Sequence, residues 1–143
     1  MSKYKGLSCI LLIDDDAPTN YIHRMVIQRS GIDTYIQIAE SGQQALDYLT
    51  CKGEYSHQKC FPQPGIIFLD INMPGMNGWE FMEDYEKLDE NQKAKIVVVM
   101  LTASVNPGDK KKSESDENIK TFIGKPLTKE ILYQIINDNF EKE

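Results

Sequence analysis

The chain has 143 residues, of which 41% are hydrophobic and 27% are charged, and its formal net charge is −6. This length and composition are typical of one globular domain, which we expect to fill residues 1–143. No apolar run approaches the ~20 residues that span a bilayer, and the first residues do not have the pattern of a secretory signal. The net negative charge argues against nucleic-acid binding, which needs a basic face. We therefore expect a cytoplasmic protein without a membrane or nucleic-acid partner.

The cysteines favour reduced thiols over a disulfide framework, because their number is odd and Cys9 falls within a predicted buried strand. Cys51, His57 and Cys60 could alternatively be three metal ligands, but their spacing matches no zinc pattern and a fourth ligand is missing. We interpret the segment that holds them, about residues 50–65, as an extended surface connection between the second helix and the third strand.

Strand patterns and helix patterns alternate five times along the chain. The first, third and fourth strands are continuous apolar runs, which is typical of strands buried on both faces of a parallel sheet. The alternation predicts an α/β fold, a (βα)5 three-layer sandwich with a parallel five-stranded sheet between two layers of helices. The predicted strands are Ser8–Ile13, Thr34–Ile38, Ile66–Leu69, Ile96–Leu101 and Lys120–Ile123.

The first helix is marked by Pro18 in its opening turn and Gly31 just past its end. We expect His23, on this helix, to face solvent. The second helix opens with a capping box that is formed by Ser41 and Gln44. The apolar residues of the first helix are Ile22, Met25, Val26 and Ile27.

The third and fifth helices carry apolar stripes, whereas the fourth does not. Asn106 and Pro107 mark the start of the fourth helix, but its residues as far as Glu117 are polar. We therefore expect this helix to be short or mobile. The stripes are Phe81, Met82, Tyr85 and Leu88 in the third helix, and Ile131, Leu132, Ile135, Ile136 and Phe140 in the fifth, which begins near Thr128.

Polar side chains follow the carboxyl ends of four predicted strands. Asp14 and Asp15 end the first strand, and Asp70 ends the third. In a doubly wound sheet of order 2-1-3-4-5 these strands are neighbours, and their ends flank the crevice where such folds bind ligands. Carboxylates that meet there repel one another unless a cation joins them, and Mg²⁺ prefers carboxylate oxygens. Thr102 ends the fourth strand and Lys125 follows the fifth.

This set of groups indicates phosphoryl chemistry. Attack by Asp70 on a phosphorus atom would give an acyl phosphate. A metal ion and Lys125 would neutralise the charge of the transferring phosphoryl group. Thr102 could then hydrogen-bond the oxygens of the product.

At these positions the chain resembles the receiver domain of two-component response regulators, the flavodoxin-like fold of the chemotaxis regulator, in its stand-alone single-domain type. Each matching motif is weak alone, but the four in order at strand ends are highly specific. The resemblance runs from about Leu7 to Phe140. The motifs are Ile13-Asp14-Asp15-Asp16, Asp70-Ile71-Asn72-Met73-Pro74-Gly75-Met76-Asn77-Gly78, Leu101-Thr102-Ala103 and Lys125-Pro126-Leu127.

The resemblance implies a role for each acidic position. Asp70 matches the phospho-accepting aspartate. Asp15 matches the direct Mg²⁺ ligand, and Asp14 the acid that binds the ion through water. Asn72 would give its backbone carbonyl to the metal.

The resemblance also implies roles at the other strand ends. Thr102 matches the switch hydroxyl and Phe122 the switch aromatic. Lys125 matches the phosphate-binding lysine. Asn72 and Ser104 occupy the two positions by which the family tunes dephosphorylation.

A response regulator of this kind would accept a phosphoryl group on Asp70 from a sensor histidine kinase or a phosphotransfer protein. Thr102 and Phe122 would then move toward the phosphoryl group and reshape the face made by the fourth helix, fifth strand and fifth helix. Output would be contact with a downstream protein or onward relay, and a homodimer through this face stays open. Such a protein is a phospho-acceptor with intrinsic phosphotransfer and autodephosphorylation, not an enzyme acting on other substrates.

Two other classes of protein are alternatives to this interpretation. A Mg²⁺-dependent phosphohydrolase of the haloacid-dehalogenase type would also use Asp70 as nucleophile, but it places a second acid where this chain has Asn72, and the chain lacks a cap domain. A constitutive pseudo-receiver that acts as a binding module needs a broken site. The site residues Asp14, Asp15, Asp70, Thr102 and Lys125 are all present.

Overall fold

The computed structural model describes residues 2–55, 63–93, 97–103 and 106–143. In these residues parallel strands alternate with α-helices along the chain. The strands are β1 (Cys9–Ile13), β2 (Tyr35–Ala39), β3 (Ile66–Asp70), β4 (Val97–Thr102) and β5 (Ile119–Gly124). The helices are α1 (Ala17–Arg29), α2 (Gly42–Thr50), α3 (Gly78–Glu86), α4 (Pro107–Glu114) and α5 (Lys129–Asn139), with short 3-10 turns at Gly53–Tyr55 and Glu90–Gln92.

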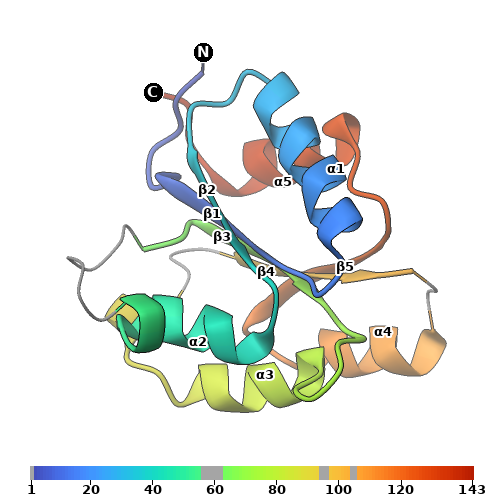
Figure 1. Cartoon of the computed structure of the whole chain (residues 1–143). Coiled ribbons are helices and arrows are strands. Elements are labelled where there is room, and N and C mark those ends of the chain that lie inside the picture. The colour runs from blue at the N-terminus through green and yellow to red at the C-terminus, as the bar shows by residue number, and fades with distance from the viewer. Residues whose placement is uncertain (1, 56–62, 94–96, 104–105) are drawn as a thin grey trace.

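The strands form one parallel sheet of order β2-β1-β3-β4-β5. Helices α1 and α5 cover one face, and α2, α3 and α4 cover the other (Figure 1). This arrangement confirms the predicted flavodoxin-like three-layer sandwich. Because β1 and β3 are neighbours whose connections leave toward opposite faces, their carboxyl ends flank the topological switch point of the sheet.

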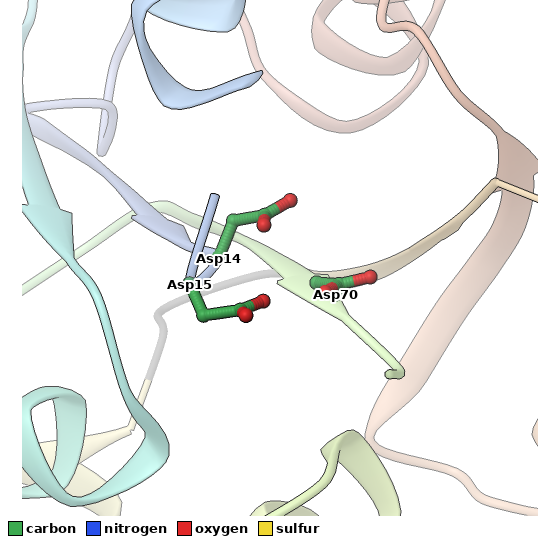
Figure 2. A group of neighbouring side chains, drawn as sticks. All are labelled: Asp14, Asp15 and Asp70. Atoms are coloured by element: carbon green, nitrogen blue, oxygen red, sulfur yellow. The ribbon is translucent and has the colours of Figure 1, made fainter. Parts of the chain in front are cut away.

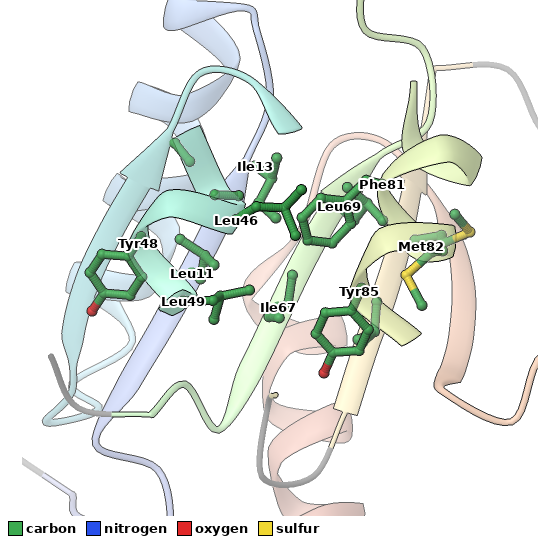
Figure 3. Close-up of a cluster of buried hydrophobic side chains, with 14 of the residues drawn as sticks. Leu11, Ile13, Leu46, Tyr48, Leu49, Ile67, Leu69, Phe81, Met82 and Tyr85 are labelled. Atoms are coloured by element: carbon green, nitrogen blue, oxygen red, sulfur yellow. The ribbon is translucent and has the colours of Figure 1, made fainter. Parts of the chain in front are cut away.

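Each face of the sheet carries its own apolar layer, because successive strand residues point to opposite faces. In β1, Leu11 and Ile13 pack toward α2 and α3, whereas Ile10 and Leu12 pack toward α1 and α5. Figure 3 shows the first layer, in which side chains of β1 and β3 meet those of α2 and α3. The buried sheet thus holds the ends of β1 and β3 in a fixed place.

Helix α1 differs from the prediction. His23 and Asn20 are buried, with 1% and 3% of their surfaces exposed, whereas Tyr21 and Ile22 are 64% and 50% exposed. The expectation of a solvent-facing His23 is therefore wrong. The inward stripe of the amino-terminal half of the helix is polar because it faces backbone groups at the end of the sheet.

Helix α4 is short, as predicted. The Asn106 side chain caps it by accepting hydrogen bonds from the N–H groups of Gly108 and Asp109, at 2.8 and 3.3 Å. Ser113 is the one buried residue of the helix.

The capping box expected at α2 is half formed. The Ser41 side chain accepts a hydrogen bond from the N–H of Gln44, but the Gln44 side chain accepts from the N–H of Glu40 and not from that of Ser41.

The cysteines divide into two kinds. Cys9 is free and buried, and burial raises the pKa of its thiol to about 11. Cys51 is disulfide-bonded, so the expectation of reduced thiols is wrong there. His57 and Cys60 lie outside the described residues, as does most of the predicted extended connection.

No helix in the described part of the chain has the length and apolarity needed to cross a membrane.

Candidate functional site

Three carboxylates meet at the carboxyl end of the sheet, as the sequence predicts. Asp14 and Asp15 follow β1, and Asp70 ends β3; one oxygen of each lies within 4.8 Å of the others (Figure 2). Asp14 and Asp70 are buried and Asp15 is exposed. Such a set of carboxylate oxygens, with one side open to water, fits a hard divalent cation.

Asp14 is held from several directions. Its Oδ1 accepts a hydrogen bond from the N–H of Asp16 at 2.9 Å, and its carbonyl oxygen accepts from the Asn20 side chain at 2.8 Å. Its own N–H donates to the carbonyl of Ala39 at 3.1 Å. The carboxylate therefore has a fixed position relative to the start of α1.

Lys125 joins two of the acids. Its Nζ lies 2.6 Å from Asp14 Oδ2 and 3.0 Å from Asp70 Oδ1. Burial alone would lower the pKa of Lys125, but the hydrogen bonds to Asp14 and Asp70 outweigh it and raise that pKa above 10.5. The ammonium is therefore charged, and it neutralises part of the acidic cluster.

Asp70 is the acid whose ionisation the fold opposes. Burial raises its pKa above 3.8, the nearby charge of Asp14 acts in the same direction, and the hydrogen bond from Lys125 offsets only part of the rise. The N–H of Asn72 also donates to this carboxylate, which brings the Asn72 backbone to the same edge of the site. An ion or a modification that relieves the repulsion would therefore act mainly on Asp70.

The loop after Asp70 is fixed by close packing. Ile71 and Met73 are buried, whereas Asn72 between them is exposed. A Cβ at Gly78 would lie 2.8 Å from the Asp70 carbonyl oxygen, so glycine lets the start of α3 touch the backbone of β3. Gly75 has a φ of +76°, which turns the loop back toward α3.

The remaining predicted residues lie on β4 and β5. Thr102 is buried at the tip of β4, where its carbonyl accepts from the N–H of Lys125 at 2.7 Å. Phe122 pairs with Met100 in the sheet and packs, half-buried, against the apolar layer beneath α3. Thr102 therefore lies on the strand between β3, which ends in Asp70, and β5, which precedes Lys125. Ser104 lies outside the described residues.

Two polar residues of α1 were missed by the sequence analysis. Asn20 hydrogen-bonds the carbonyl of Asp14, and His23 Nε2 accepts from the N–H of Leu127 at 3.2 Å. A signal for them existed: Asn20, His23 and Ile27 follow the i, i+3, i+7 spacing of one helix face. That spacing is hidden by the apolar residues Ile22, Met25 and Val26 on neighbouring positions.

The sequence profile of the response regulator receiver domain family matches residues 10–137. The chain belongs to this family. The matched residues contain the acidic triad and Lys125, so these groups form the acidic site of a receiver domain.

Related proteins agree with this assignment. Response regulator Rcp1 of Synechocystis sp. is 32% identical over 100 residues, which cover 70% of this chain and 65% of Rcp1. Hybrid signal transduction histidine kinase I of Dictyostelium discoideum is 28% identical over 129 residues, which cover 90% of this chain and 7% of the kinase. The chain thus spans less than two thirds of the length of either relative.

Solved receiver structures have the same fold. The two component response regulator from Cytophaga hutchinsonii matches with a TM-score of 0.79 and 32% identity, covering 92% of this chain and 96% of that one. The Mn²⁺-bound form of response regulator Rcp1 matches with a TM-score of 0.70 and 27% identity, covering 92% and 90% of the two chains.

Proposed function

We propose that this receiver domain accepts a phosphoryl group on Asp70, with Mg²⁺ bound by the acidic triad, and signals as a cytoplasmic response regulator. The observation that carries the proposal is the arrangement around Asp70. Its carboxylate lies among Asp14, Asp15 and the Lys125 ammonium, at the exposed rim of a rigid sheet. The Mn²⁺-bound Rcp1 structure supports a divalent ion in such a site.

The proposed reaction moves one phosphoryl group. A carboxylate oxygen of Asp70 attacks the phosphorus, a P–O bond forms, and the P–N bond of a phosphohistidine donor or the P–O bond of a small acyl phosphate breaks. The leaving group keeps the electron pair of that bond. Lys125, which contacts Asp70 already, pairs with the phosphoryl oxygens, and Thr102 donates a hydrogen bond to them.

When bound at the acidic triad, Mg²⁺ would supply a second positive charge beside that of Lys125. Asp15 is proposed as a direct ligand, Asp14 as a ligand through water and Asn72 through its backbone carbonyl. Asn72 and Ser104 are the proposed positions that set the lifetime of the phosphoryl group.

The donor is proposed to be a histidine kinase or a histidine phosphotransfer protein. Tyr21 and Ile22 support a docking place for it, because they form an exposed apolar pair on α1 beside the acidic rim. The Tyr21→Ser, Ile22→Ser double variant should lose transfer from a protein donor while it keeps the reaction with a small acyl phosphate.

The output is proposed to pass through Thr102 and Phe122 to the face made by α4, β5 and α5. The polar surface of α4 supports this, because a helix with little buried apolar area shifts at small cost in free energy. The face would contact a downstream protein, a relay partner or a second copy of the chain.

The direct test is incubation with Mg²⁺ and a small acyl-phosphate donor, followed by intact mass measurement. We expect one phosphoryl adduct that is stable in acid and labile in base. The adduct should be lost in Asp70→Asn and kept in Asp84→Asn, which changes a partly exposed carboxylate on α3. An adduct of equal yield in Asp70→Asn would contradict the proposed acceptor.

The same assay separates the alternatives. A phosphohydrolase would turn over many phosphate esters without a stable adduct. A pseudo-receiver would form no adduct and would bind its partner equally well with and without the donor.

A further inference from the structure

The inward side of α1 near the acidic site carries two polar residues, and two large apolar residues of the same turns are exposed, which is unusual for an amphipathic helix. Asn20 and His23 are buried, whereas Tyr21 and Ile22 are exposed. Burying polar side chains costs free energy unless they are hydrogen-bonded. The two buried residues therefore need an explanation in terms of what they hold.

Each of the two side chains holds one part of the site. The Asn20 amide donates to the carbonyl of Asp14 at 2.8 Å, at the end of β1. His23 Nε2 accepts from the N–H of Leu127 at 3.2 Å, two residues after Lys125 in the β5–α5 connection. Because the two residues lie three positions apart on one helix, α1 connects the end of β1 with the segment that follows Lys125.

We propose that Asn20 and His23 are positioning residues: α1 acts as a rigid bracket that fixes the separation of Asp14 and Lys125 across the phosphoryl site. Asn20 sets the position of the acid, and His23 sets the position of the loop that carries the ammonium. This inference rests on the proposed phosphoryl acceptance at Asp70.

The buried but incompletely satisfied Asn20 supports a positioning role. Its Oδ1 has no hydrogen-bond partner among the described residues, although the side chain is almost fully buried. An apolar residue of the same shape would avoid that unsatisfied acceptor. The donation to the Asp14 carbonyl is thus the feature that distinguishes asparagine from leucine at this position.

The test for His23 compares two substitutions of nearly equal shape. His23→Gln keeps an acceptor at the reach of Nε2, whereas His23→Met has the same length but only a weak sulfur acceptor. We expect His23→Met to lower the phosphorylation rate at saturating Mg²⁺ roughly tenfold, with no loss of Mg²⁺ affinity. His23→Gln should restore most of the rate.

The test for Asn20 has the opposite signature. Asn20→Leu removes the donation to Asp14 while it keeps the number and branching of the side-chain heavy atoms. We expect it to weaken Mg²⁺ binding roughly threefold or more, with a smaller effect on the rate once Mg²⁺ is saturating. A general loss of stability would lower the phosphorylation rate and the Mg²⁺ affinity together. It would not make one substitution affect mainly the rate and the other mainly the Mg²⁺ affinity.

Tyr133→Phe is the matched control. The Tyr133 hydroxyl donates to the carbonyl of Ser30 at the far end of α1, so its loss also removes one helix contact but leaves the acidic site untouched. The inference predicts normal rate and normal affinity in this variant. It is overturned if Tyr133→Phe lowers the rate as much as His23→Met, if His23→Gln is as slow as His23→Met, or if His23→Met matches the wild type.

A measurement on the wild-type chain covers the case in which His23→Met does not fold. Nitrogen NMR should find His23 protonated on Nδ1 and unprotonated on Nε2, and the Leu127 amide should exchange slowly. The opposite tautomer or a fast-exchanging amide would overturn the bracket. If the wild type takes up no phosphoryl group, the proposed function is wrong. The tautomer measurement would still test the hydrogen bond between His23 and Leu127.

Discussion

Lys125 Nζ lies 2.6 Å from Asp14 Oδ2, so the proposed phosphate-binding cation is paired with a proposed metal-binding acid. The same ammonium lies 3.0 Å from Asp70. A lysine in this place competes with a divalent ion for the negative charge of the site. The pair therefore couples the metal affinity of the domain to the position of Lys125.

The first prediction concerns this competition. Lys125→Met removes a positive charge next to the acids, so Mg²⁺ should bind roughly tenfold more tightly, as measured by calorimetric titration. Without metal, the loss of the partner of two buried carboxylates should lower the free energy of unfolding by roughly 3 kcal/mol. Lys120→Met, an exposed lysine on β5, should change neither quantity. Unchanged Mg²⁺ affinity in Lys125→Met would contradict the competition.

The second prediction follows from the raised pKa of Asp70. Because the folded state holds the proton of this carboxyl more tightly than the unfolded chain, its contribution to stability is lost as pH rises from 3.8 through the folded pKa. Asp70→Asn should therefore raise the metal-free free energy of unfolding at about pH 7 by on the order of 1 kcal/mol, and have less effect near pH 3. Urea unfolding with a chelator at both pH values measures this. A less stable variant at neutral pH would show that the Lys125 pair dominates.

The third prediction concerns His23. Burial lowers its pKa, Asp14 opposes the shift and Lys125 adds to it. The folded state therefore resists a proton that the unfolded chain accepts, and stability present above pH 6.5 is lost as pH falls toward the folded pKa. His23→Gln has no such proton to take up. The decline of the melting temperature on acidification should be smaller in the variant than in the wild type, and equal declines would argue against a buried neutral His23.

The acidic site could be predicted because its signals are local. Asp14 and Asp70 each follow a run of apolar residues, and parallel strands bring such ends to one edge of the sheet. The inward face of α1 could not be predicted in the same way. Asn20 and His23 are buried because of two backbone groups that approach the helix only in the folded chain. Likewise, the sequence predicts that Lys125 lies at the rim of the sheet. Its ion pair with Asp14, 111 positions away, depends on side-chain geometry that the sequence pattern does not show.

The fourth prediction compares one substitution at two equivalent helix starts. Gly42 and Gly78 are the first residues of α2 and α3. A Cβ at Gly78 would lie 2.8 Å from the backbone of Asp70 and Ile71, whereas at Gly42 it would meet the flexible side chain of Met76. Gly78→Ala should lower the free energy of unfolding by roughly 2 kcal/mol and slow phosphorylation. Gly42→Ala should change stability by less than about 0.5 kcal/mol. Equal effects would mean that the contact at Asp70 relaxes freely.

The last prediction concerns the attachment of α4, the polar helix of the proposed output face. The Trp79 indole N–H donates to Asp109 at 3.2 Å, and the Lys112 ammonium lies 4.5 Å from the centre of the indole ring. Trp79 therefore links the start of α3, which touches the Asp70 backbone, to a helix with almost no buried apolar surface.

Trp79→Phe keeps an apolar ring but removes the hydrogen bond to Asp109 and weakens the contact with Lys112. Because α4 has few other attachments among the described residues, its amides should exchange roughly fivefold faster in this variant. Amides of α5 should be unchanged, since that helix packs on the opposite face of the sheet through Leu132 and Ile136. Hydrogen exchange resolved by residue measures both helices in one experiment. Equal protection of α4 in wild type and variant would show that its backbone contacts with β5 hold it without the tryptophan.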